Sequence, residues 1–123
     1  MRKTVCLLSS LLWAQLLDAH HGPGIRGYDP EKPVTISGVI TKCIECGGGG
    51  HGILEIRVGS VMWAVTLPAN SLLKKAKVPM NRLKPKHTVT VAGFANKSKA
   101  NDMFADEIIA DGVKVLGRLI PIG

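Results

Sequence analysis

The stretch ILEIRVGSVMWAVTLPANSLLKKAKVP, residues 53–79, decides the fold, because its hydrophobic period changes once along its length. In its first part apolar and polar side chains alternate, which is typical of two β-strands that each present one face to a core. A turn at Gly59 separates the two strands and indicates a tight hairpin. Apolar residues then recur at helical spacing, so the sequence predicts one short helix near residues 70–77, with Asn70 or Ser71 as its cap.

Strand patterns continue on both sides of this stretch. Residues 34–43 alternate β-branched and polar side chains around Gly38, which indicates a bulge or a coil in a strongly bent strand. Alternation returns in residues 87–95 and 103–110, and an Asp-Gly turn then leads into a last short strand at 113–116. In the central hairpin, the side chains predicted to face inward are Leu54, Ile56, Val58, Val61, Trp63, Val65 and Leu67.

Three strands, a short helix and two further strands are the order of elements in an OB-fold, a small barrel whose helix lies between strands three and four. The sequence therefore predicts an all-β, OB-fold-like barrel of five main strands within residues 34–116. An open sandwich with a similar number of strands is the alternative.

The first 19 residues have the order of an export signal: a basic start, an apolar run from Val5 to Leu17, and small residues up to Ala19. The run is shorter than the ~20 residues that cross a bilayer. We expect cleavage after Ala19 and a periplasmic or secreted product with no transmembrane segment; an uncleaved anchor is the alternative. Residues 20–33 are rich in glycine and proline and predict an irregular arm, which leaves 34–123 as the OB-like domain.

Cleavage after Ala19 would place His20 at the start of the mature chain. An α-amino group with a pKa of ~8 loses its proton more readily than a lysine, so this amine and the imidazole beside it can bind copper. His21 and His51 are further candidate ligands, since imidazole is a common ligand of copper and zinc. The alternative is that these histidines are solvated residues of an arm and of a strand end.

The sequence CIEC places Cys43 and Cys46 three residues apart. Haem attachment would require a histidine where Gly47 stands, and a thioredoxin-type pair would require a helix N-terminus. The two remaining interpretations are a local disulfide and a pair of metal ligands. An extended chain sets such Cα atoms ~10 Å apart, whereas a disulfide tolerates at most ~7 Å, so both need a turn. An oxidising compartment favours the disulfide.

The net charge of +7 is unevenly spread, because no acidic residue lies between Glu55 and Asp102. Clustered cations attract phosphates, anionic lipid head groups or acidic partners. A solvated helix face with an adjoining loop is the alternative. The cations of this basic segment are Lys74, Lys75, Lys77, Arg82, Lys84 and Lys86.

Other functions have little support. The chain lacks a Gly-x-Ser-x-Gly elbow and a phosphate-loop signature, and no carboxylate pair stands out, so we do not expect an enzyme. Binding of single-stranded nucleic acid needs exposed aromatic platforms, and Trp63 falls on an apolar face. His87 is interpreted as an ordinary surface residue. The sequence thus predicts an exported binding protein for copper or another transition metal; the alternative is a structural or interaction module that docks a protein partner or an anionic envelope surface without metal.

Five phrases of the chain form one recognisable pattern: AHHG, YDPEKPVTISGVI, HGILEI, LKPKHTVTVAG and IIADGVKVL. The pattern resembles a widespread family of exported bacterial OB-like domains of unknown function, which begin AHHS after the signal and continue with DP-x-KPVT, NPH and LKPGDRVTV. The resemblance covers nearly the whole mature chain and implies an OB-like fold and an exported location. The chain departs from the family at GGGGH, which replaces NPH but keeps His51, at CIEC, and at Lys86-His87, which replaces Gly-Asp.

Overall fold

The computed structural model describes residues 26–117, so the expected signal segment and residues 20–25 of the expected arm lie outside the described residues. Two short helices, α2 (Asn70–Lys75) and the 3-10 helix η2 (Met80–Arg82), separate the third strand from the fourth. The strands are β1 (Tyr28–Ile44), β2 (His51–Val58), β3 (Val61–Ala69), β4 (Thr88–Asn96), β5 (Asp102–Ala110) and β6 (Val113–Leu116).

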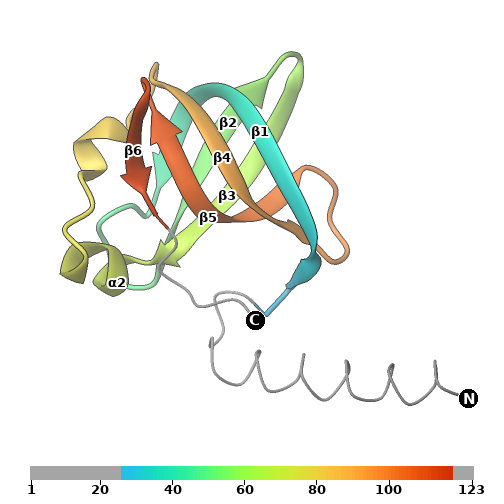
Figure 1. The fold of residues 1–123 in the computed structure, drawn as a ribbon, viewed down its shortest axis with the longest axis horizontal. Helices are drawn as coiled ribbons and strands as arrows, with labels where there is room; N and C mark the ends of the chain where they lie inside the picture. The colour runs from blue at the N-terminus through green and yellow to red at the C-terminus, as the bar shows by residue number, and fades with distance from the viewer. Residues whose placement is uncertain (1–25, 118–123) are drawn as a thin grey trace, which may run out of the picture.

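Five of these strands close into a ring. β1 pairs with both β2 and β4, β2 pairs with β3, and β4 pairs with β5, all antiparallel. The ring closes where β3 and β5 pair in parallel, from Ala64 opposite Asp102 to Thr66 opposite Phe104. The predicted OB-fold is therefore confirmed. The short sixth strand, β6, pairs with Ile108–Ala110, beyond the part of β5 that pairs with β3. Figure 1 shows the helical segment on one side of the barrel and the tip of the β2–β3 hairpin on the other.

The long strand β1 bends so strongly that it serves both sides of the barrel. Its first half pairs with β4 and its second half with β2, and Val39 pairs with both. A Cβ atom at Gly38 would collide with the carbonyl oxygen of Arg57, so the glycine allows the β2 backbone to come close. The predicted bend is confirmed, but the irregularity in the β1–β2 ladder falls at Thr41 rather than at Gly38.

The predicted boundary between the arm and the domain is wrong, because β1 begins at Tyr28 rather than at residue 34. Tyr28 pairs with Asn96 and Pro33 pairs with Phe94, so the four residues between them bulge out of the ladder. Prolines are tolerated at such a bulge because they have no N–H to contribute to a ladder. The glycine and proline content therefore indicated a local irregularity within a strand.

The predicted turns are confirmed. The residue Gly59 has a φ of 63° in the β2–β3 turn. Asp111 and Gly112 have φ values of 51° and 81°, as a type I′ hairpin requires at both central positions. Helix α2 begins where expected, but neither Asn70 nor Ser71 caps it: the N-cap residue is Ala69, which makes no side-chain hydrogen bond.

The core fills the inside of the barrel, as the alternation predicts. The side chains of Leu54, Ile56, Val65 and Leu67 are fully buried there. Trp63 packs against this core while partly exposed. Val61 is the one clear error among the predicted inward-facing residues, since it is 40% exposed beside the hairpin tip, where the strands extend beyond the barrel. Within residues 26–117, no helix is long and apolar enough to span a membrane.

Candidate functional site

His51 is the one predicted histidine ligand that the structure describes, and it is the first residue of β2, directly after the four glycines. Its Nδ1 lies 2.6 Å from the carbonyl oxygen of Leu67 on β3. A carbonyl can only accept, so Nδ1 carries a proton, and in the neutral imidazole Nε2 keeps its lone pair. Metal-binding histidines commonly have their second ring nitrogen fixed in this way, which holds the tautomer and the ring orientation.

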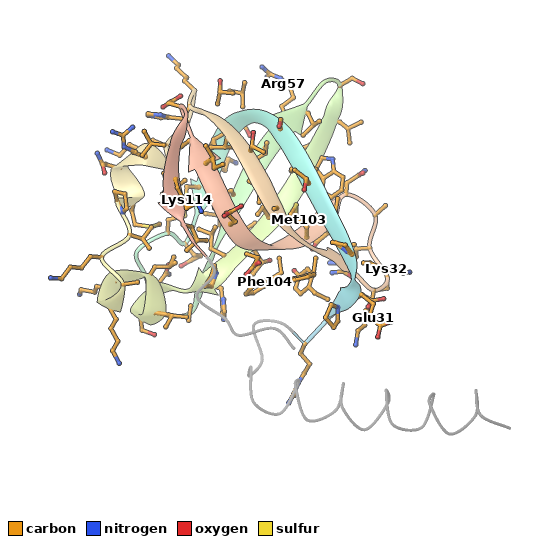
Figure 2. The ribbon with its side chains drawn as sticks, viewed as in Figure 1. Glu31, Lys32, Arg57, Met103, Phe104 and Lys114 are labelled. Atoms are coloured by element: carbon orange, nitrogen blue, oxygen red, sulfur yellow. A yellow bond between two sulfur atoms is a disulfide. The ribbon has the colours of Figure 1, made fainter. Side chains whose placement is uncertain are left out.

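The ring of His51 belongs to a small aromatic cluster on the outside of the barrel. Met103 and Phe104 are neighbours on β5 and are labelled in Figure 2; Met103 joins the barrel core, whereas Phe104 does not. Phe104 is nevertheless only 1% exposed. The rings of Tyr28 and His51 pack against it, with ring centroids 5.6 Å and 6.3 Å from the Phe104 centroid. We call Tyr28, His51, Thr66 and Phe104 the Phe104 cluster.

A hydrogen bond fixes Tyr28 within this cluster, since its hydroxyl lies 2.9 Å from Oγ1 of Thr66. Burial raises the pKa of the Tyr28 phenol above its usual value, and the nearby carboxylate of Asp102 acts in the same direction, against a lowering effect of the Thr66 hydrogen bond. Tyr28 is therefore a neutral phenol at physiological pH. The start of β1 is thus anchored to the same Phe104 ring that His51 contacts, which matters because the expected arm precedes Tyr28 directly.

The glycine loop before His51 is held in place by Asn70. Its Nδ2 donates to the carbonyl oxygens of Glu45 and Gly48, each at 3.0 Å, and its backbone N–H donates to Gly50 at 2.7 Å. The side chain is only 7% exposed, and its Oδ1 has no hydrogen-bond partner in the described part of the chain. Asn70 therefore fixes a loop of glycines that would otherwise have wide conformational freedom.

Cys43 and Cys46 are joined by a disulfide, as the sequence predicts. Their Cα atoms lie 5.8 Å apart, and the required turn is made by Glu45, whose φ is 56°. Joined sulfurs are not thiolates, so in this form the pair does not provide the alternative metal ligands. Accordingly, residues 26–117 contain no group of three or more His, Cys, Asp or Glu side chains arranged to hold a metal ion. His20 and His21 lie outside the described residues, and their role stays a prediction.

The predicted basic segment lies together on α2, η2 and the loop that leads into β4. Its five lysines are exposed and Arg82 is half-buried. Among the described residues, Lys114 forms an ion pair with Glu107, at 3.0 Å, and His87 contacts Asp111, and neither contact involves the segment. The six cations are Lys74, Lys75, Lys77, Arg82, Lys84 and Lys86.

His87 lies at the surface, as the sequence predicts, and it makes one specific hydrogen bond there. Its Nδ1 lies 2.6 Å from Oδ2 of Asp111, in the turn before β6. This hydrogen bond lowers the pKa of the Asp111 carboxyl. The His87 imidazole therefore links the residue before β4 to the β5–β6 turn. Its hydrogen bond involves no residue of the Phe104 cluster.

Sequence patterns did not identify the residues around His51. Tyr28 stood in the expected irregular arm, and Thr66 and Phe104 meet through the parallel pairing of β3 with β5, which the sequence does not specify. Asn70 did carry a signal, as a short polar residue before a helix, but that signal indicated a cap. Its burial against the glycine loop depends on tertiary contacts.

The likeness to known proteins concerns the fold. No protein-family model matches the chain, and no curated protein matches it either. Among solved structures, it is similar to the Stn1–Ten1 complex of S. pombe, an OB-fold protein, with a TM-score of 0.51 and 14% identity over 64% of this chain and 57% of that chain. It is also similar to yeast Stn1 and Ten1 (TM-score 0.49, 15% identity, 63% of this chain and 42% of that chain).

A third solved structure, of the ZRD-deleted mutant of TiaS in complex with agmatine, has a TM-score of 0.48 and 18% identity over 74% of this chain and 24% of that chain. The chain therefore spans less than two thirds of the length of each of these three proteins. At 14% identity, the likeness to the S. pombe complex concerns the fold alone. It agrees with the strand pairing, which defines a single OB-fold barrel.

Proposed function

We propose that the protein is an exported binding protein that holds copper or another transition metal through the processed N-terminal His20 and through His51. The observation that carries the proposal is the hydrogen bond from Nδ1 of His51 to the Leu67 carbonyl, at 2.6 Å. In the neutral imidazole this bond leaves Nε2 as the unprotonated nitrogen, and it sets the orientation of the His51 ring before any metal binds. Nitrogen ligands of this kind suit copper and zinc.

The expected arm is long enough to complete such a site. The rings of Tyr28 and His51 both pack on Phe104, so their centroids are at most about 12 Å apart. The eight Cα–Cα steps from His20 to Tyr28 span up to ~26 Å when extended. The Phe104 cluster therefore lies within reach of the arm that precedes β1. Cleavage after Ala19 would add the free amine of His20, which has no counterpart in the uncleaved chain.

The proposal is tested by titrating copper(II) into protein that begins at His20. The variant His51→Asn retains a donor for the Leu67 carbonyl but lacks Nε2, and we expect it to bind copper at least 10-fold more weakly. The matched control is His87→Asn, which removes an imidazole bonded to Asp111 and should leave copper affinity unchanged. A form with one extra alanine before His20 should also bind more weakly, with a different spectrum. Equal affinity and equal spectra for all four proteins would exclude the site.

A second candidate function is an interaction module without metal. The observation that favours it is the basic segment, whose five lysines are exposed and take part in no ion pair with another residue of 26–117. In this case the segment docks on an anionic envelope surface or an acidic partner. Sedimentation with anionic vesicles should then show binding that decreases steeply between low and physiological salt. No sedimentation at low salt would reject docking on an anionic membrane.

A further inference from the structure

A groove lies between the glycine loop and the helical segment. It consists of two cavities of about 520 Å³ and 360 Å³, and both are lined by Gly47 and Met80, so they adjoin. We call them together the Gly47–Met80 groove. Each volume falls within the ~300–1,000 Å³ that is common for small-molecule sites.

The floor of this groove is apolar. Leu73 and Leu83, each 2% exposed, line its two cavities from the side of the helical segment, together with the half-buried Met80. The disulfide between Cys43 and Cys46 lines the smaller cavity. An apolar chain in the groove would therefore contact side chains that already belong to, or pack against, the barrel core.

The edge of the groove carries positive charge. Lys74 and Lys77 line the larger cavity, and Lys84 lines the smaller one; all three are exposed. No acidic side chain lines either cavity. An anionic group beside Lys74 and Lys77 would therefore meet ammonium groups, while the carboxylate of Glu45 lies beside Gly48 on the loop.

The glycine loop offers further hydrogen-bond donors. Of the four glycine N–H groups, only that of Gly48 donates to a carbonyl within the described part of the chain, to Glu45 at 3.3 Å. Gly49 has open space where a Cβ would stand, whereas a Cβ at Gly48 would lie 3.5 Å from Oε1 of the exposed Glu45, so the one carboxylate seen beside the loop is at Gly48. Because Asn70 holds the loop through the carbonyls of Glu45 and Gly48, an anionic ligand that binds its N–H groups would not first have to order the loop.

We propose that the Gly47–Met80 groove binds a single-chain anionic amphiphile, with its carboxylate or phosphate head at Lys74, Lys77 and the glycine N–H groups and its chain along the apolar floor. A small amphiphile fits better than an intact bilayer surface. Within residues 26–117, the large apolar residues that protrude are Val61, Met62 and Val113, none of which lines the groove, whereas Leu73 and Leu83 in the groove are buried. The inference is independent of the metal proposal, and it shares lysines with the second candidate function.

The test is an NMR titration of ¹⁵N-labelled protein with octanoate and with octyl phosphate, both below their micelle-forming concentrations. We expect saturable shifts at Gly47–Gly50 and Lys74 with at least one of the two, and the head group that binds more tightly identifies the natural one. Octyl glucoside, which has the chain without the charge, and inorganic phosphate, which has the charge without the chain, should each bind at least 10-fold more weakly. Equal binding of either control would overturn the proposal, and so would saturable shifts confined to residues outside the groove.

Two double variants and one single variant distinguish binding in the groove from nonspecific attraction to positive charge. Lys74→Glu with Lys77→Glu should weaken octanoate or octyl phosphate binding at least 10-fold, whereas the same change at Lys97 and Lys99, exposed lysines after β4, should not. Gly49→Leu narrows the groove without altering charge, at a position with open space and an ordinary φ. It should abolish amphiphile binding and leave any vesicle binding intact. Unchanged amphiphile binding by Gly49→Leu would refute the groove, even if vesicles still bind.

Discussion

The hydrogen bonds of Asn70 make the most specific prediction about stability. The variant Asn70→Ala removes both Nδ2 bonds, to Glu45 and Gly48, that tie the glycine loop to the start of α2. Each bond contributes a net of about 0.5–1.5 kcal/mol. The two carbonyls belong to exposed residues and can turn to water, and the unpartnered Oδ1 disappears as well. We therefore expect the variant to lose about 1–2 kcal/mol in the free energy of unfolding.

Thermal unfolding followed by circular dichroism measures this loss. For a domain of this size, 1 kcal/mol lowers the Tm by about 4–8 °C, so Asn70→Ala should unfold roughly 5–15 °C below the wild type. The matched control is Asn81→Ala, an exposed asparagine in η2 for which about 0.5 kcal/mol or less is expected. Equal Tm values for the two variants would show that Asn70 does not hold the loop.

Three further predictions concern the barrel and its cross-link. Tyr28 is the only tyrosine, so the ultraviolet absorbance of tyrosinate reports on it alone. Because burial raises the pKa of Tyr28, its ionisation in the folded protein should occur above the usual ~10. The part of the folding free energy that depends on the neutral phenol should be lost as pH rises through this raised, folded-state pKa. A transition at the same pH in unfolded protein would contradict the burial. Gly38→Ala should lower the free energy of unfolding by about 2 kcal/mol or more, as expected for overpacking. Gly49→Ala, measured by the same denaturant titration, should lower it little. Similar unfolding midpoints for the two variants would be inconsistent with the close approach of Arg57 to Gly38. Thiol labelling without reductant should find neither Cys43 nor Cys46 free. Because the disulfide closes so short a loop, replacing both cysteines by serine should lower the free energy of unfolding by about 2 kcal/mol or less. Two reactive thiols in the untreated protein would rule out the disulfide.

The fold was predictable because each of its signals is local. Alternation in the β2–β3 hairpin, the change of period near residue 70 and the Asp111-Gly112 turn all depend on neighbouring residues, and all three are confirmed. The errors arise where tertiary context decides. Val61 alternates correctly with its neighbours, but the hairpin extends past the core, so this position is exposed.

The site was less predictable, because its parts come from distant positions. Tyr28 and Thr66 are 38 residues apart and meet only after β1 and β3 join the same barrel. Position alone identified His51 as a candidate, yet nothing in the sequence indicates that Leu67 fixes its tautomer. Asn70 shows the same limit, since a residue that favours helix caps is used to hold a loop.

Pulsed EPR of copper(II) bound to the protein that begins at His20 tests the proposed metal site most directly. The remote imidazole nitrogen of each coordinated histidine modulates the echo, so the number of histidine ligands can be counted. We predict that His51→Asn removes the contribution of one imidazole, whereas His87→Asn leaves the spectrum unchanged. A wild-type spectrum that is identical to that of His51→Asn would show that His51 does not bind the metal, and would contradict the proposed function.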